Sequence, residues 1–235
     1  MRRIVLLSVL AALTAPASAL ALDRSVSVHA TVEREVPNDA AEVHFSVSKE
    51  RPGRAAALHV VAVRLRAVIA AAQAAPGVGP GDLTTGSISV RRVEKGQRPV
   101  YRASEGVTVV THRPEEAGTL VAAAVAAGAT ATRGPSFFAS DGEAAYDAAL
   151  VEALQRAKTK AEMLAAAAGA SLGPALTIAE SGAVTPFEGA DAAEPVSKCV
   201  SAPAGGRASA CAAPPPVKPG NSTVTASVDA TFALQ

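Results

Sequence analysis

The stretch that decides the fold is SVSVHATVEREVPNDAAEVHFSVS, residues 25–48. It holds two runs in which apolar and polar side chains alternate, residues 25–36 and 41–48. Such alternation is typical of β-strands with one buried face and one solvated face. Pro37 and Asn38, which lie between the two runs, are turn-forming residues. The sequence therefore predicts a β-hairpin at the start of the folded domain.

Helical and strand patterns alternate over the rest of the chain. Apolar residues at helical spacing predict helices over residues 53–75, 114–127 and 140–168. Ser140 and Glu143 form a capping-box pattern at the start of the third helix. Its apolar face is made of Ala149, Leu150, Ala153, Leu154, Ala157, Ala161, Leu164 and Ala168. Alternating or apolar runs predict further strands over residues 83–93, 100–112, 133–139, 175–180 and 223–234.

The order of these elements predicts the fold class. Residues 40–112 and 133–234 both have the order β-α-β-β, which indicates an internal repeat. Each helix needs a sheet to cover its apolar side. We therefore expect one α+β domain, residues 22–235, with helices packed on one face of an antiparallel sheet.

The N-terminal segment, residues 1–21, has the features of a secretory signal peptide. Arg2 and Arg3 precede a short apolar run, and small residues suited to cleavage follow at Ala17, Ala19 and Ala21. Removing this segment leaves 20 basic residues against 21 acidic ones. That balance argues against nucleic acid as a partner, because phosphate binding needs a basic surface. We expect an exported, soluble mature chain with no transmembrane segment.

A low-complexity segment, residues 185–220, separates the last two predicted strands. It is rich in Pro, Ala and Gly and has no periodic apolar face, so we expect a mobile loop. The two cysteines of the chain, Cys199 and Cys211, both lie in it. Because exported proteins fold in an oxidising compartment, they form a candidate disulfide. The alternative is two free thiols that pair with other chains or not at all.

No familiar catalytic pattern occurs in the sequence. The nucleophile elbow G-x-S-x-G, the phosphate loop G-x-x-x-x-G-K-[ST] and the zinc motif H-E-x-x-H are all missing. We therefore predict a protein that is not an enzyme and has no cofactor. Glu115, Glu116 and Asp141 lie at predicted helix starts, where they offset the positive end of the helix dipole.

The best metal-ligand candidates are two histidines of the predicted hairpin. His29 and His44 lie on its polar side, together with Glu33 and Glu42. A metal site needs three or four ligands in a defined geometry. We interpret these side chains as a solvated face and predict no metal site.

The helix predicted over residues 53–75 has an unusually narrow polar side. His59, Arg66 and Gln73 are spaced by seven and form one stripe, and most of the remaining surface is apolar. An ordinary surface helix has a broader polar face. One sheet does not account for so much apolar surface, so we expect burial against a second copy in a homo-oligomer.

Several segments resemble the SIMPL-domain family. Val36-Pro37-Asn38-Asp39-Ala40, Asp82-Leu83-Thr84-Thr85, Tyr101-Arg102-Ala103-Ser104, Leu172-Gly173, Pro219-Gly220 and Thr231-Phe232-Ala233-Leu234 fall in the family's order. The long third helix resembles the family's as well. The resemblance covers residues 25–235. Glu105-Gly106 and residues 185–220 depart from the family pattern.

The resemblance implies the function of an envelope protein. Bacterial relatives include periplasmic immunogenic proteins and a group linked to oxidative stress, and some form ring-like or channel-like oligomers. We therefore expect a periplasmic protein that self-assembles, with association with the outer membrane left open. The alternative is a periplasmic binding module for a small ligand or a metal.

Overall fold

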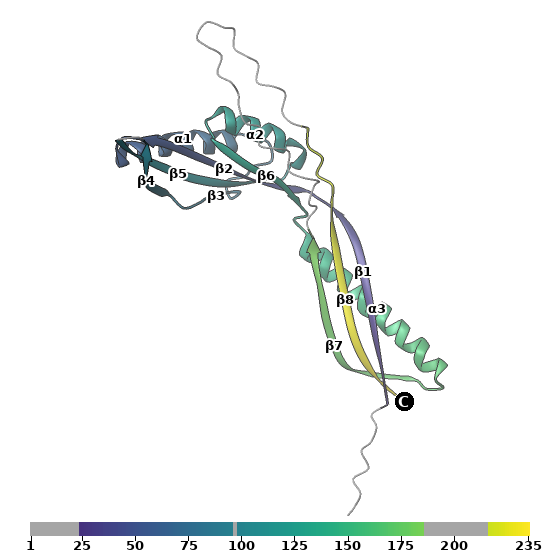
Figure 1. The fold of residues 1–235 in the computed structure, drawn as a ribbon. Helices are drawn as coiled ribbons and strands as arrows, with labels where there is room; N and C mark the ends of the chain where they lie inside the picture. The colour runs from purple at the N-terminus through teal and green to yellow at the C-terminus, as the bar shows by residue number, and fades with distance from the viewer. Residues whose placement is uncertain (1–23, 96–97, 186–215) are drawn as a thin grey trace, which may run out of the picture.

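The computed structural model describes residues 24–95, 98–185 and 216–235. Two antiparallel sheets meet end to end, and each has helix packed on one face (Figure 1). The molecule is therefore elongated and bends where the sheets join. The α+β class and the antiparallel pairing predicted from the sequence are confirmed, with the strands divided between two sheets.

The first sheet has five strands. Its main order is β3-β5-β2-β6, and β4 pairs with β5. The strands are β2 (Ala40–Arg51), β3 (Leu83–Thr85), β4 (Ser89–Lys95), β5 (Arg98–Thr111) and β6 (Ala131–Phe138). Helix α1 (Arg54–Gln73) packs on β5 and β2, and α2 (Ala117–Ala126), preceded by the 3-10 turn η1 (Pro114–Glu116), packs beside α1. The strand predicted over residues 83–93 is thus two strands.

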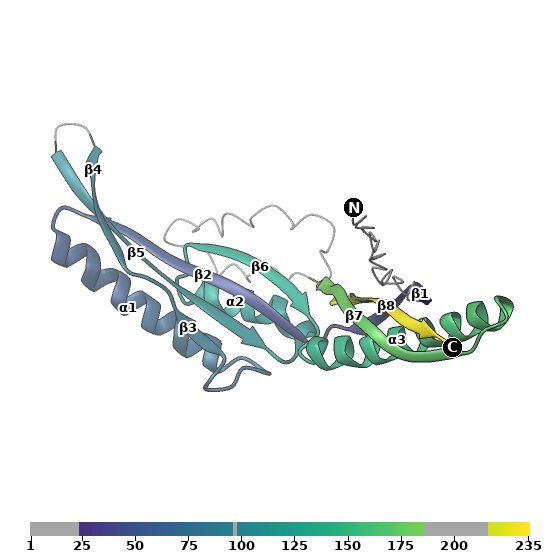
Figure 2. The ribbon, with the colours of Figure 1, turned by 90° about the horizontal axis from the view of Figure 1, so that it is seen from below.

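The second sheet has three strands in the order β1-β8-β7. They are β1 (Ser25–Pro37), β7 (Leu172–Thr185) and β8 (Asn221–Leu234), and α3 (Gly142–Ala167) covers one face. Figure 2 shows α1 lying along the five-stranded sheet and α3 along the three-stranded sheet. The central strand, β8, is the last element of the chain.

The predicted N-terminal hairpin is wrong. β1 pairs with β8 over its whole length, from Ser25 opposite Ala233 to Pro37 opposite Asn221, whereas β2 pairs with β5 and β6. The chain continues from one sheet into the other at residues 38–39 instead of turning back. Alternation tells which side chains of a strand are buried but not which strand lies beside it.

The β-α-β-β repeat is present, but one strand differs from the prediction. The first unit is β2, α1, β4 and β5, and the second unit is β1, α3, β7 and β8. Strand order β2-β5-β4 under α1 matches strand order β1-β8-β7 under α3. The sequence placed β6 at the start of the second unit, but β6 pairs with β2 in the first sheet. β1 takes its place, so the second unit is completed by the first strand of the chain.

The core of the three-stranded sheet is built from small side chains. Ala149, Ala153, Ala157, Ala161 and Ala165 are buried, and their spacing of four makes a stripe that turns by about 40° per step around α3. Because of this turn, Ala165 faces the sheet at the end of the helix, and Leu164, expected on the apolar face, is 45% exposed. Alanine lets the helix axis approach the strands closely.

Helix α1 is covered on two sides by its own chain. Val61, Leu65 and Val68 are buried against the sheet, and α2 packs on a second side. Val63, on the outer side, is 47% exposed. By length and mean hydropathy α1 is the one helix of the described residues that could cross a membrane, but its buried side belongs to the core of the first sheet.

Candidate functional site

Residues of the family-like segments meet where the two sheets join. Asn38 is buried, and its side-chain amide donates to the Pro219 carbonyl at 2.7 Å. Its backbone N–H donates to the Gly220 carbonyl at 3.1 Å, and its Oδ1 accepts from the Ser222 hydroxyl at 2.6 Å. The crossing from β1 to β2 is thereby tied to the approach to β8. We call Asn38, Asp39, Ser140 and Ser222 the junction cluster.

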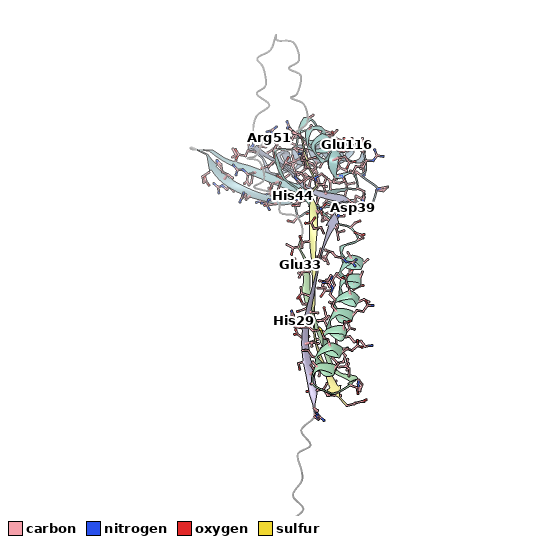
Figure 3. The ribbon with its side chains drawn as sticks, turned by 90° about the vertical axis from the view of Figure 1, so that its right-hand side faces the viewer. His29, Glu33, Asp39, His44, Arg51 and Glu116 are labelled. Atoms are coloured by element: carbon pink, nitrogen blue, oxygen red, sulfur yellow. The ribbon has the colours of Figure 1, made fainter. Side chains whose placement is uncertain are left out.

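Asp39 ties a third chain segment to the same place (Figure 3). Its Oδ1 accepts from the Ser140 backbone N–H at 2.7 Å, and its Oδ2 accepts from the Ser140 hydroxyl at 2.6 Å. These hydrogen bonds from Ser140 hold the pKa of Asp39 below its ordinary value. Ser140 lies between β6 and α3, so the junction cluster joins both crossings between the sheets.

The capping box predicted for α3 does not form. The Ser140 hydroxyl is used by Asp39, and the residue at the N-cap is Asp141, which makes no side-chain capping hydrogen bond. Glu143 lies in the first turn, where its charge is favourable to the helix dipole. A tertiary hydrogen bond to a carboxylate has replaced a local one, because hydrogen bonds to charged acceptors are the stronger kind.

We expect Asp39→Ala to weaken the junction cluster by about 1 kcal/mol at neutral pH, since Asp39 is exposed and its hydrogen bonds compete with water. A lowered folded pKa means that the contribution is complete above the ordinary carboxyl pKa. It is lost as the pH falls from there through the lowered value. Urea unfolding of wild type and variant at pH 7 and at pH 2 measures this, with Asp141→Ala as the control. A difference that is the same at both pH values would contradict it.

A row of polar side chains lies on the open face of the three-stranded sheet. His29 Nδ1 lies 3.0 Å from Asp229 Oδ1, and His29 Nε2 lies 3.0 Å from Thr31 Oγ1. Thr31 Oγ1 is in turn 3.0 Å from the Ser227 hydroxyl. The order carboxylate, imidazole, hydroxyl is that of an activated nucleophile. However, the His29 and Asp229 side chains are 55% and 65% exposed, and water at such groups screens the pair.

The two histidines considered as metal ligands lie far apart. His29 is on β1 in the second sheet, whereas His44 is on β2 in the first sheet, beside Thr108 (Figure 3). The expectation that both share one polar face with Glu33 and Glu42 is wrong, because the hairpin that would join them does not form. Within the part of the chain that the structure describes, no three His, Cys, Asp or Glu side chains are grouped to hold a metal ion.

A shallow hollow of about 380 Å³ lies between the first turns of α3 and the end of β7. Tyr146 projects from the helix and donates a hydrogen bond to Glu180 at 2.5 Å, which raises the pKa of the tyrosine hydroxyl. Gly182 lies beside them, and a Cβ there would fall 2.2 Å from the Thr225 carbonyl oxygen. Sequence reasoning missed this site, because a helix and a strand end separate Tyr146 from Glu180 in the chain.

The acidic residues at helix starts have the surroundings that the sequence predicted. Glu115 and Glu116 lie in the first turn of η1.

Glu152 joins α3 to β1 through an ion pair with Arg34 at 2.6 Å, and it also contacts Arg156 at 2.6 Å. The hydrogen bond from Arg34 lowers the pKa of Glu152.

Cys199 and Cys211 lie outside the described residues, so their disulfide stays a prediction.

The family was identified by comparison with known proteins. The family model described as SIMPL, protein of unknown function (DUF541), matches residues 26–232. This range contains α1 to α3, and it reaches from β1 to β8, which pair with each other in the three-stranded sheet. No curated protein matches the chain. The chain therefore belongs to the SIMPL family.

Proposed function

We propose that this SIMPL protein is a non-enzymatic periplasmic protein that acts by assembling with copies of itself in the cell envelope. One observation supports the proposal most. Eight large apolar side chains are exposed in the described residues, and five of them lie on the second unit. They are Val151, Met163 and Leu164 on α3, and Leu176 and Ile178 on β7. Contact with a second copy through α3 or β7 would remove such apolar side chains from water, and exposed apolar patches are typical of protein contact surfaces.

The physiological setting is part of the same proposal. The features of a signal peptide in residues 1–21 support export, and family resemblance supports a role in envelope or oxidative-stress physiology. The hydrogen-bonded row at His29 supports a solvated surface rather than a reaction centre, because catalysis by such a group needs a dry, preorganised surrounding.

We expect mature protein from the periplasm to begin at Leu20 or Leu22 and to sediment as an oligomer at micromolar concentration. N-terminal sequencing and sedimentation velocity test the two parts separately. A chain still beginning at Met1 would contradict export, and a monomer would contradict assembly. A deletion strain grown under peroxide and under envelope stress then tests the physiological role.

A binding module is the second candidate, and the hollow at Tyr146 is the observation that favours it. Its lining contains the carboxylate of Glu143 and the aromatic ring of Tyr146, and a second carboxylate, Glu180, is hydrogen-bonded to the Tyr146 hydroxyl. A small cationic ligand is the matching chemistry, since cations are attracted both to carboxylates and to aromatic faces. A monomer whose melting temperature rises with such a ligand, and does not rise in Tyr146→Ala, would favour this function over assembly.

A further inference from the structure

Among the residues that the structure describes, no strand pairs with the outer edge of β7 along its regular part. In the ladder between β1 and β8 the Leu234 N–H donates to the Arg24 carbonyl, so even-numbered residues of β8 bond to β1. Odd-numbered residues of β8 therefore bond to β7, as the paired hydrogen bonds between Ser171 and Gln235 also show. From Thr177 to Thr185, the backbone groups of the odd-numbered residues of β7 are therefore hydrogen-bonded to β8. The backbone groups of its even residues, Ile178, Glu180, Gly182 and Val184, point outward.

The other described sheet edges carry features that block strand addition. On β1, the outward carbonyls of His29 and Thr31 accept from Lys160 at 3.2 Å and from Arg156 at 3.5 Å, both from α3. On β6, Pro135 lacks an N–H and the register shifts. β4 is short and carries four charged residues, and β3 has only three residues. Natural proteins protect their edges by these means.

The free stretch of β7 reads nearly the same in both directions. From residue 177 to 185 the sequence is T-I-A-E-S-G-A-V-T, centred on Ser181. Thr matches Thr, Ala matches Ala, and Ile matches the similarly branched Val across that centre. The one position that differs across the centre is Glu180, which corresponds to Gly182. The only charged side chain of the strand therefore faces a residue without a side chain.

We propose that β7 pairs with β7 of a second copy, antiparallel, about a two-fold axis at Ser181. This inference rests on the proposed self-assembly and names its contact surface. Outward even residues pair with each other, so Ile178 lies opposite the partner's Val184 and Glu180 opposite the partner's Gly182. The pairing joins two three-stranded sheets into one six-stranded sheet. The contact is isologous, as two-fold dimers require.

Charge selects this register among its neighbours. Shifting the axis to Glu180 would place two carboxylates directly opposite each other, which is unfavourable across a ladder. Shifting it to Gly182 would oppose Glu180 to the apolar Val184 of the second copy and carry Ile178 past the end of β7. The axis at Ser181 keeps nine residues paired and places the two Ser181 side chains together on the open face.

Cross-linking tests the axis directly. Ser181 lies at a pair without backbone hydrogen bonds to its copy, where the two Cα atoms are about 4.5 Å apart, within disulfide range. We expect Ser181→Cys, in a chain with Cys199→Ser and Cys211→Ser, to form a covalent dimer under mild oxidation. The matched control is Ala179→Cys in the same chain. Its copy is offset by four residues, roughly 13 Å, so it should stay uncross-linked.

Charge substitution supplies an independent readout that does not depend on cysteine chemistry. Ser181→Lys and Ser181→Glu each place a charge opposite the same charge of the second copy. We expect each variant to lower the dimer fraction at least tenfold at micromolar concentration. Mixing the two variants should restore the dimer. An oligomeric wild type in which Ser181→Cys cross-links no better than Ala179→Cys, or in which mixing restores nothing, would overturn the β7 pairing and leave self-assembly standing. A monomeric wild type would overturn both.

Discussion

A chain that ends at Gly220 is expected to lose the three-stranded sheet altogether. β8 is the central strand, and its removal leaves β1 and β7 without a neighbour and exposes the alanine stripe of α3. The side chains of Val224, Val228 and Phe232 contribute about 1.5–3 kcal/mol each through burial. With the two ladders also lost, the effect is of the order of the whole stability of a domain, about 5–15 kcal/mol.

Limited proteolysis and far-UV circular dichroism of the truncated chain measure this effect. We expect rapid cleavage in residues 142–185 and a smaller strand signal, with aggregation on concentration. A truncated chain that melts like the wild type would contradict the central position of β8.

The matched control is a loop replacement. Thr185 lies opposite Thr223, so β7 and β8 are neighbours up to the end of β7. Residues 186–215 lie outside the described residues, and about twelve Gly/Ser residues, which reach up to roughly 40 Å, are expected to connect the strands with little change in melting. Residues 216–220 are kept, because Val217 packs on the first sheet and Pro219 and Gly220 bind Asn38.

Ala157→Glu is expected to unfold the second unit at room temperature. Ala157 is 0% exposed at the middle of the stripe where α3 lies on β8 and β1. A glutamate there both overfills a closely packed contact and places a carboxylate in the apolar core of the three-stranded sheet. Overfilling costs about 1–3 kcal/mol. Burying the carboxylate costs more, or shifts the group to its neutral form. Thermal unfolding followed by circular dichroism measures the loss.

Thr159→Glu is the control for this variant. Thr159 is exposed on the same helix, two residues away, so the same charge is introduced without burial. We expect a change in stability within about 0.5 kcal/mol, as is usual at surface positions. Equal melting of both variants would mean that α3 does not lie on the sheet along its alanine stripe.

The sequence by itself determined which segments are helix and strand and, for most positions, which side chains are buried; Leu164, expected on the apolar face of its helix but 45% exposed, is an exception. In β8, the alternation of Val224, Ala226 and Val228 with polar residues predicted the face that α3 covers. The helix over residues 53–75 and the α+β class followed in the same way. These properties depend on local spacing and on the transfer of apolar side chains out of water, which a short stretch of chain already specifies.

Only the tertiary structure decided which strands lie side by side. The exchange of β6 for β1, the pairing of Ser25 with Ala233 and the free edge of β7 depend on segments that are distant in the chain. The junction cluster likewise brings Asn38 and Asp39 to Ser222 and Ser140. Alternating strands are nearly equivalent as partners when judged one at a time. The choice between them is made by the packing of complete sheets and helices, because only then are all backbone groups and apolar faces satisfied together.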